Sequence, residues 1–319
     1  MNYNKKRTII LSLVLSLFLL LCSCGGTNGT AETGKKTKVV CTIFPPYDFV
    51  REIAGDTVEL TMLLSPGAEV HTYEPTPQDI IKVQSCDVFI YVGGESDSWV
   101  NDILSSMDTS SMQIITLIDC VEPLEEEIVE GMQTEQEEHG DEEPEYDEHV
   151  WTSPRNAMLI TQKINAALKI ASPEYAGDYD ENTSDYLEKL AALDNEFAAV
   201  VQAGNRDTIV FADRFPLRYF AEAYGLKYYA AYPGCAAESE PSVSTVSFLI
   251  DKVKAEKFPA IFYIEFSNEQ MANTISEETG AQKLLFHSCH NVSKDDFMSG
   301  VSYLQLMEQN LSNLKIALQ

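Results

Sequence analysis

The sequence contains few basic residues and lacks the short motifs of several common protein classes. Its 319 residues include 22 Lys and Arg against 50 Asp and Glu, a formal net charge of −28. This balance argues against a nucleic-acid-binding protein, because a phosphate backbone is bound through Lys and Arg. There is also no GxxxxGK[ST] motif, so the chain does not itself hydrolyse ATP, and no Ser in a nucleophile-elbow context. The acidic balance instead fits a protein that attracts cations.

Cysteine and histidine are scarce as well. With seven Cys and five His, any metal site must be built from a short list of residues. The absence of a CxxC pair argues against a thiolate zinc finger, and the absence of an HExxH helix argues against a zinc hydrolase. Hydrophobic residues make up 45% of the chain, which is enough for true cores and excludes a wholly disordered protein.

The first 23 residues are predicted to be an export signal and not part of the fold. Basic residues precede a short apolar run at 9–21 and then small residues, the order typical of a signal peptide. The end of this segment resembles a bacterial lipoprotein processing site, with Cys24 as the lipidated first residue and 24–38 as a flexible tether. The alternatives are an ordinary secretory signal and a single anchor helix. Residues 1–23 hold three basic and no acidic residues, so 19 basic residues remain against 50 acids.

Strand and helix patterns alternate along the rest of the chain, in two halves. The first half, 39–172, predicts strands at 39–44, 57–64, 87–92 and 113–118 and helices at 47–54, 76–83, 98–107 and 154–170. The second half, 205–319, predicts strands at 208–211, 226–232, 259–265 and 283–286 and helices at 215–224, 242–256, 268–279 and 301–318. Such alternation is typical of parallel sheets. The predicted fold class is therefore α/β, with two parallel-sheet domains and a ligand cleft at the carboxyl ends of their strands.

Two stretches between these patterns are unusual. Residues 173–204 carry apolar side chains at three- and four-residue steps, the period of one long amphipathic helix that links the domains. Residues 122–148 hold 14 acids and no Lys or Arg and show no apolar period, so we expect a solvated, mobile loop. This loop either collects cations beside His149 or serves only solubility.

Several His residues lie where predicted strands end. His71 follows the break after 57–64, His149 ends the acidic loop, and His287 and His290 flank a Cys after the last strand. A single His in such a loop is more often bonded to the backbone than to a metal. Several of them at strand ends form a stronger signal, because neutral imidazole suits zinc and related metals.

Two of these His residues lie in motifs that resemble a known family, the substrate-binding proteins of bacterial zinc and manganese ABC transporters. The segment PGAEVHTYEPTP at 66–77 resembles the first metal-ligand loop of that family, and EHVWTSPRNA at 148–157 resembles the second. The resemblance runs from about residue 39 to the C-terminus. It implies two α/β domains joined by a stiff helix, with one metal ion in the cleft and with His71 and His149 among its ligands.

The chain departs from the family pattern at the other two ligands. The family usually has His or Glu at the third position, where this chain has Asp213 and Arg214. Since a guanidinium cannot bind a cation, we take Asp213 as the ligand, and the alternative is a structural Asp213–Arg214 pair. The fourth ligand, usually an acid after the last strand, falls nearest His287, with His290 as the alternative. Three acids are expected to orient the site or to serve as ligands, namely Glu265, Glu148 and Glu69.

The resemblance implies a function as well as a fold. The chain is expected to bind zinc outside the cytoplasm and to deliver it to an ABC permease, as a monomer that is not an enzyme. It would be held by lipid on the outer face of the cell membrane, or lie in the periplasm. Manganese is the alternative metal, and a secreted zinc hydrolase or a surface adhesin is the alternative function. From their loops near the cleft, we also predict a disulfide between Cys235 and Cys289, with free thiols as the alternative.

Overall fold

The computed structural model of the protein describes residues 35–69, 73–133, 145–236 and 241–319. Within them, the chain from Thr37 to Gln319 forms one compact unit. The predicted signal at 1–23 and the lipidation site Cys24 lie outside the described residues. Among the described helices, none is both long and apolar enough to cross a membrane.

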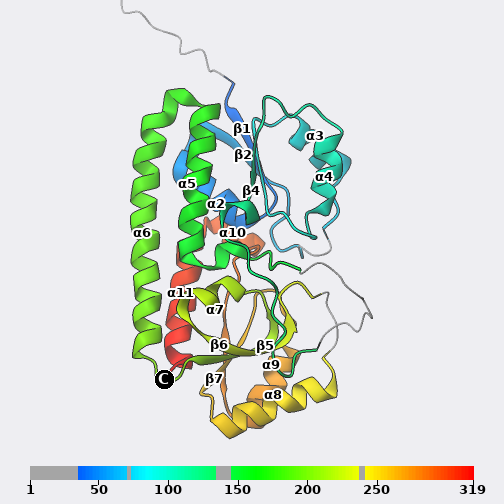
Figure 1. The fold of residues 1–319 in the computed structure, drawn as a ribbon, viewed down its shortest axis with the longest axis vertical. Coiled ribbons are helices and arrows are strands. Elements are labelled where there is room, and N and C mark those ends of the chain that lie inside the picture. The colour runs from blue at the N-terminus through cyan, green and yellow to red at the C-terminus, as the bar shows by residue number, and fades with distance from the viewer. Residues whose placement is uncertain (1–34, 70–72, 134–144, 237–240) are drawn as a thin grey trace, which may run out of the picture. The chain divides into compact units, whose positions relative to one another are not determined.

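The first half contains a four-stranded parallel sheet in the order β2-β1-β3-β4. Its strands are β1 (Thr37–Cys41), β2 (Val58–Met62), β3 (Val88–Tyr91) and β4 (Gln113–Thr116). Side chains alternate between the two faces of a strand, so Val39 packs in the main core and Val40 in a smaller one. The main-core face is covered by α2 (Phe44–Ala54) and α5 (Pro154–Ala171). The other face is covered by α3 (Pro77–Gln84) and α4 (Ser98–Ser105) (Figure 1).

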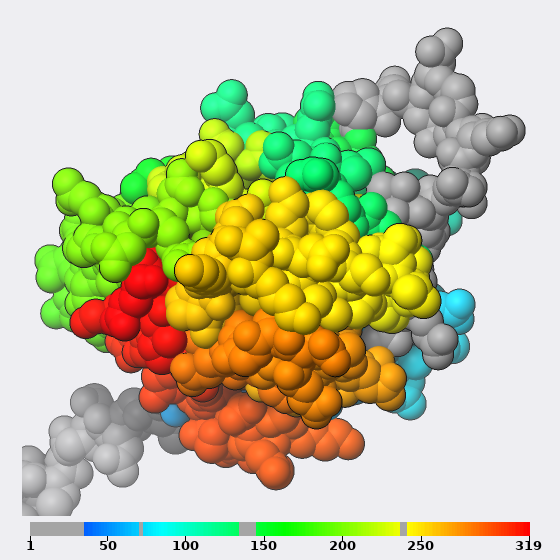
Figure 2. All heavy atoms as spheres, turned by 90° about the horizontal axis from the view of Figure 1, so that it is seen from below, coloured from blue at the N-terminus to red at the C-terminus, as the bar shows by residue number. Residues whose placement is uncertain are grey.

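The second half repeats this arrangement with a four-stranded parallel sheet in the order β6-β5-β7-β8. Its strands are β5 (Thr208–Phe215), β6 (Lys227–Pro233), β7 (Ala260–Tyr263) and β8 (Gln282–Leu285). One face packs on α7 (Arg218–Tyr224), and the other on α8 (Val243–Glu256) and α9 (Gln270–Thr279). Figure 2 shows the outer surface that α8 and α9 form, in yellow and orange.

One long helix packs beside both halves. A 3-10 turn, η4 (Pro173–Tyr175), leads into α6 (Ala176–Ala203), which packs against α2 and α5 of the first half. Further along, α6 packs against α7 and against α11 (Tyr303–Ala317) (Figure 1). The main core continues along this helix from one sheet to the other. The predicted α/β fold with a long backbone helix is confirmed, while the domain boundaries at 172 and 204 stay a prediction.

Some element boundaries differ from the predicted ones. Strand β5 extends to Phe215, through residues where a helix was predicted to begin, because it continues to pair with β6 as far as Pro233. A short helix, α10 (Lys294–Ser299), was not predicted; the hydroxyl of Ser293 caps it by accepting from the Asp296 N–H. The remaining short turns are η1 (Gly55–Thr57), η2 (Ile118–Cys120) and η3 (Val150–Thr152).

The described parts of the acidic segment pack against the second half instead of lying free in solvent. The Leu124 N–H donates to the Tyr219 hydroxyl at 3.0 Å, and the Gln133 N–H donates to the Ala231 carbonyl at 2.8 Å. The returning residues pair with the outgoing ones through a bridge at 125 and 146. We call residues 121–133 and 145–148 the acidic strap. The strap is thus tied to the second half at these points, while its acids at 122, 125, 127, 130 and 145 are exposed. The solvated, mobile loop stays a prediction, and residues 134–144 lie outside the described residues.

Candidate metal centre

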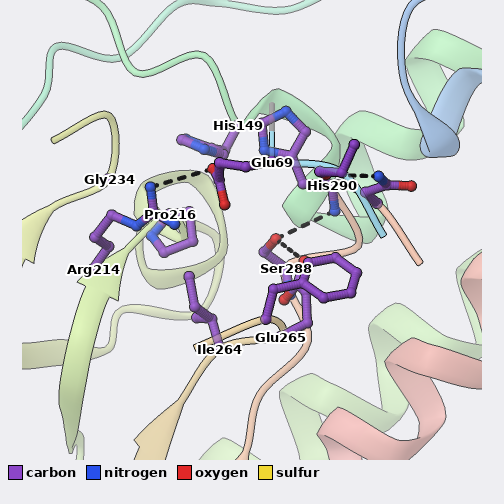
Figure 3. A pocket seen from close by; sticks show the side chains of 12 residues that line it. Glu69, His149, Arg214, Pro216, Gly234, Ile264, Glu265, Ser288 and His290 are labelled. Carbon is purple, nitrogen blue, oxygen red and sulfur yellow. Dashed lines mark hydrogen bonds and ion pairs between the residues drawn. The ribbon is translucent and has the colours of Figure 1, made fainter. Parts of the chain in front are cut away.

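A small cavity lies between the two sheets, at the carboxyl ends of the second-half strands. The second half contributes residues at or just after the end of each strand, among them Arg214, Gly234, Glu265 and His290. The first half contributes Ala68, Glu69 and His149 (Figure 3). The cavity measures about 30 Å³, which is room for about two water-sized particles. It therefore suits a single ion with one further small ligand, and not an organic molecule.

Two imidazole rings lie edge to face on the wall of this cavity. His149 is 1% exposed and His290 is 8% exposed, and their ring centroids lie 5.3 Å apart with the rings perpendicular. The buried Trp151 packs against both, with its ring centroid 5.6 Å from that of His149 and 4.8 Å from that of His290. Its indole N–H donates to the Ser288 carbonyl at 2.8 Å. Trp151 thereby links the chain that carries His149 to the loop that carries His290.

A buried carboxylate that sequence reasoning did not single out orients His149. Oδ1 of Asp147 accepts the His149 backbone N–H at 2.8 Å and lies 3.2 Å from Nδ1 of its ring. Burial alone lowers the pKa of His149, but Asp147, with Glu148 and Glu126, raises it above its ordinary value. A carboxylate on one ring nitrogen directs the other nitrogen toward a metal. The Asp-Xaa-His spacing at 147–149 was the signal in the sequence.

The loop after β8 is tied to the first half, and this places His290 at the cavity. The His290 carbonyl accepts the Phe44 N–H at 3.3 Å, and the Asn291 side chain donates to the carbonyls of Ser65 and Ala68, both at 2.9 Å. Cys289 has a positive φ of 63°, the left-handed conformation that non-glycine residues rarely adopt. This reversal separates the directions of the two His residues that flank it.

His287, the predicted fourth ligand, contacts a residue of the cavity wall without lining the cavity itself: its Nδ1 lies 3.5 Å from Oε1 of Glu265. The His287 backbone N–H donates to Oδ1 of Asn310 and its carbonyl accepts from Nδ2 of Asn310, each at 2.7 Å. Its Nδ1 accepts the Cys289 N–H at 2.9 Å. His287 is not among the described residues that line the cavity, whereas the alternative, His290, is.

The predicted third ligand also lies off the cavity wall. Oδ1 of Asp213 accepts the N–H of Arg214 at 2.9 Å, and Oδ2 accepts that of Ile264 at 3.4 Å. Burial raises the pKa of Asp213. The β5–β6 register shifts between Phe211 and Arg214, and such a bulge redirects side chains. Of the two neighbours, Arg214 and not Asp213 is among the described residues that line the cavity.

Two of the three acids predicted to support the site line the cavity. Glu265 accepts the Ser288 N–H at 2.7 Å and its hydroxyl at 2.5 Å, and Glu69 lies 3.5 Å from the Arg214 guanidinium. Glu148 is not among the described residues that line the cavity. Its carboxylate accepts the Ser96 N–H at 2.9 Å. It packs over Gly94, where an added Cβ would lie 2.4 Å from its carboxylate.

The remaining predictions concern His71 and the disulfide. His71 lies outside the described residues. Among the described residues, no three His, Cys, Asp or Glu side chains group closely enough to hold a metal ion. The predicted disulfide is contradicted, because Cys235 and Cys289 are both free thiols. The side chain of Cys289 is fully buried in the main core, while the Cys235 N–H donates to Glu126 of the acidic strap at 3.1 Å.

Comparisons with known proteins agree with the fold. The family model described as zinc-uptake complex component A, periplasmic, matches residues 39–317. The chain is 29% identical over 315 residues to the high-affinity zinc uptake system protein ZnuA of Bacillus subtilis, with 97% of each chain covered. It is 30% identical over 315 residues to the zinc-binding lipoprotein AdcA of Streptococcus pneumoniae, covering 98% of this chain but only 60% of that longer protein.

A solved structure agrees with these sequence matches. The crystal structure of the Zn(II)-bound ZnuA-like domain of Streptococcus pneumoniae AdcA superposes with a TM-score of 0.73 at 29% identity. The match covers 89% of this chain and 99% of that domain. The chain therefore belongs to the family of periplasmic A components of zinc-uptake complexes.

Proposed function

We propose that this chain binds one divalent transition-metal ion, zinc, in the cavity and delivers it to an ABC permease outside the cytoplasm. The observation that carries the proposal is the perpendicular pair of buried imidazoles, His149 and His290, on the wall of a cavity with room for an ion and one further small ligand. Imidazole is a favoured zinc ligand, and a transport site fills its coordination shell where a catalytic site keeps a position open.

The proposed ligands are three imidazoles and one carboxylate. His149 and His290 line the cavity, and we add His71, which is two residues beyond the cavity residue Glu69 in the sequence. Glu265 supplies the oxygen, since it lines the cavity and Ser288 holds its carboxylate by two hydrogen bonds. Carboxylates that bind metals are themselves usually held by such second contacts. The described side chains do not group closely enough to hold an ion as they stand, so binding requires small shifts of the loops that carry them.

This set favours zinc over manganese. Three nitrogens and one oxygen make a tetrahedral, borderline-soft site of the kind zinc prefers, whereas manganese prefers more carboxylate oxygens. The names of the relatives support the same metal, because the Bacillus subtilis and Streptococcus pneumoniae proteins are both named for zinc. The family is an uptake component and not an enzyme family, which removes the support for the hydrolase alternative.

The location and the anchor are part of the proposal. The family description is periplasmic and AdcA is named a lipoprotein, in agreement with a lipid on Cys24. The acidic strap adds negative charge near His149, because the carboxylates at 126, 147 and 148 all act electrostatically on its ring. The attraction of this charge for cations weakens with salt.

The proposal is tested by metal analysis of the purified protein followed by competitive titration with zinc and manganese. We expect one zinc per chain, tighter zinc than manganese binding, and a loss of affinity in each of His71→Ala, His149→Ala and His290→Ala. The matched control is His139→Ala, which removes an imidazole within the acidic segment and should keep the parent affinity to within about threefold. Unchanged zinc affinity in both His149→Ala and His290→Ala would show that the metal site is elsewhere.

A further inference from the structure

The cavity wall carries a permanent positive charge at the position where the family resemblance places a metal ligand. Arg214 lies near the end of β5, directly after the point where Ala212 and Asp213 together stand opposite the single residue Ala231 of β6. A bulge of this kind re-aims the next side chain. Arg214 is turned to the cavity and only 12% of its side chain is exposed (Figure 3).

The contacts of this guanidinium are few and long. Its Nη1 lies 3.5 Å from Oε1 of Glu69, and 3.5 Å from the carbonyl of Ala236. Glu69 comes from the first half, so the pair spans the cavity from one wall to the other (Figure 3). A guanidinium remains charged at all relevant pH values. The Glu69 carboxylate is therefore held by a cation that cannot be titrated away.

The two cavity carboxylates are consequently in different situations. Glu265 is held by the N–H and the hydroxyl of Ser288, both neutral donors. Nδ1 of His287 also lies 3.5 Å from its carboxylate, but this nitrogen accepts the Cys289 N–H, so the negative charge of Glu265 remains available to an ion. The charge of Glu69 is compensated by Arg214. One full carboxylate is thus left beside the two imidazoles of His149 and His290.

We propose that Arg214 determines the metal specificity of the cavity by withholding Glu69 from the bound ion. This inference rests on the proposed function. With Glu69 held by Arg214, the ion meets several imidazoles and one carboxylate, a set that suits zinc. If Glu69 were released, a second carboxylate would join the set, and harder ions such as manganese would gain more than zinc would. Arg214 acts through Glu69 and does not touch the ion.

The test compares zinc and manganese affinities in the parent and in Arg214→Gln, by competitive titration of the full chain. Removing the charge relieves repulsion of both ions, so both affinities should rise. The specific expectation is that manganese gains at least about tenfold more than zinc, the size of coupling that contacting groups show. Adding Glu69→Gln to Arg214→Gln should restore the parent ratio of the two affinities. Arg214→Lys, which keeps the charge, should keep the parent ratio.

Two matched variants control for general effects. Arg206→Gln removes the same charge from a guanidinium that contacts the Lys257 carbonyl and the Phe258 ring instead of the cavity, and should leave the ratio unchanged. Glu69→Gln alone leaves the Arg214 charge uncompensated and should lower both affinities, but it should leave their ratio unchanged to within about threefold, because the withheld carboxylate is not a ligand. Glu69→Gln tests the specificity role of Arg214 even if Arg214→Gln fails to fold. Melting curves of both variants show whether each is folded.

The outcomes separate this inference from the proposed function. If Arg214→Gln raises zinc and manganese affinity by the same factor, or if Glu69→Gln alone changes the ratio of the two affinities, the specificity role of Arg214 is overturned while the metal site stands. If the parent binds neither metal, or if His149→Ala and His290→Ala keep the parent affinity, the proposed function itself fails.

Discussion

Asp147 and His149 show how single residues prepare the cavity. One carboxylate oxygen accepts the backbone N–H of His149 and also lies against its ring nitrogen, so the ring has one preferred orientation. Asp147 is 1% exposed, and burying a charge is unfavourable unless it is paired and hydrogen-bonded. We therefore expect Asp147 to serve the site more than the stability of the fold.

Replacing Asp147 with Asn should lower zinc affinity by about 10- to 100-fold, the usual effect of removing a residue that orients a metal-binding imidazole. Isothermal competition with a zinc chelator measures the loss. The matched control is Asp194→Asn. Asp194 lies on α6, and its carboxylate accepts hydrogen bonds from Arg155 and Tyr224. Equal affinities in the Asp147 and Asp194 variants would contradict the role of Asp147.

His287 and His290 should respond oppositely to substitution. His290→Ala should lower zinc affinity by more than about 100-fold, since a direct ligand contributes more than a residue that orients one. His287→Ala should keep most of the affinity but lower the free energy of unfolding, because the buried Cys289 N–H loses its acceptor at a cost of about 1–3 kcal/mol. Urea unfolding and chelator competition on both variants check this. Loss of zinc affinity in His287→Ala alone would restore His287 as the ligand.

Among the elements, the acidic strap joins the first half to the second. The hydroxyl of Tyr219 on α7 accepts the Leu124 N–H and donates to the Asp147 carbonyl, both at 3.0 Å. A single hydroxyl thus holds the outgoing and the returning arm of the strap. Since Asp147 orients His149, the strap connects α7 to the metal site.

Tyr219→Phe should lower the free energy of unfolding by about 1–3 kcal/mol, because it leaves a buried N–H and a buried carbonyl without their partner. Urea unfolding measures the change, and faster hydrogen exchange at the Leu124 amide would locate it. Tyr229→Phe is the matched control. Its hydroxyl makes only long contacts at 3.3 and 3.4 Å, so a change within about 0.5 kcal/mol is expected. An equal loss in both variants would argue against the strap contact.

The alternation of strand and helix patterns was enough to predict both parallel sheets and α6. These elements bury one face, and the spacing of apolar residues in the sequence shows which face is buried. Local details were not predictable in the same way. The bulge in β5 arises from pairing with β6, whose paired residues lie 18 or 19 positions later, and Arg214 instead of Asp213 lines the cavity after it. The left-handed conformation of Cys289 lies between His287 and His290, and no pattern in the sequence marks it. The contacts that tie the strap to the second half were not predictable either, because their partners lie about 100 residues later.

At the scale of the whole unit, the two sheets share one continuous core along α6. The buried face of this helix carries Tyr179, Tyr186, Leu190 and Phe197, so the helix cannot bend without opening packed contacts. A metal-binding protein built this way should close by small local shifts of loops, since packed cores resist continuous deformation.

Zinc addition should therefore leave the radius of gyration of residues Thr37–Gln319 unchanged within error. Small-angle X-ray scattering with and without zinc measures this on the same sample. The control is the His149→Ala variant, in which any change that zinc causes by unspecific binding would persist. A large contraction in the parent but not in the variant would contradict the packed-core argument.

The acidity of the molecule also affects its stability. Burial raises the pKa of Asp97 to about 6, so its native form holds a proton that the unfolded chain releases near pH 4. The stability from this group is complete below about pH 4 and is lost as the pH rises through about 6. Asp97→Asn should remove this dependence. Relative to the parent, the variant should gain up to about 3 kcal/mol between pH 4 and 7.

Urea unfolding at several pH values checks the slope. The control is Asp180→Asn, for which the expected pH dependence of stability is opposite. The hydrogen bonds from Lys169 and Asn165 lower the pKa of Asp180, so the parent loses the stability that ionised Asp180 contributes as the pH falls. Asp180→Asn should therefore lose stability relative to the parent as the pH rises. If Asp97→Asn keeps the slope of the parent, the buried carboxyl is not the source.

The return of the last helix to the first half has a consequence for the order of folding. The Tyr303 N–H donates to Asp48 at 2.7 Å, and the Arg51 side chain donates to the Val301 carbonyl at 2.7 Å. These contacts join residues about 250 positions apart, and such distant pairings form slowly. A growing chain cannot complete even its first core until the segment after 286 has been made. His290 belongs to that segment, so we expect the cavity and the proposed metal site to be assembled last.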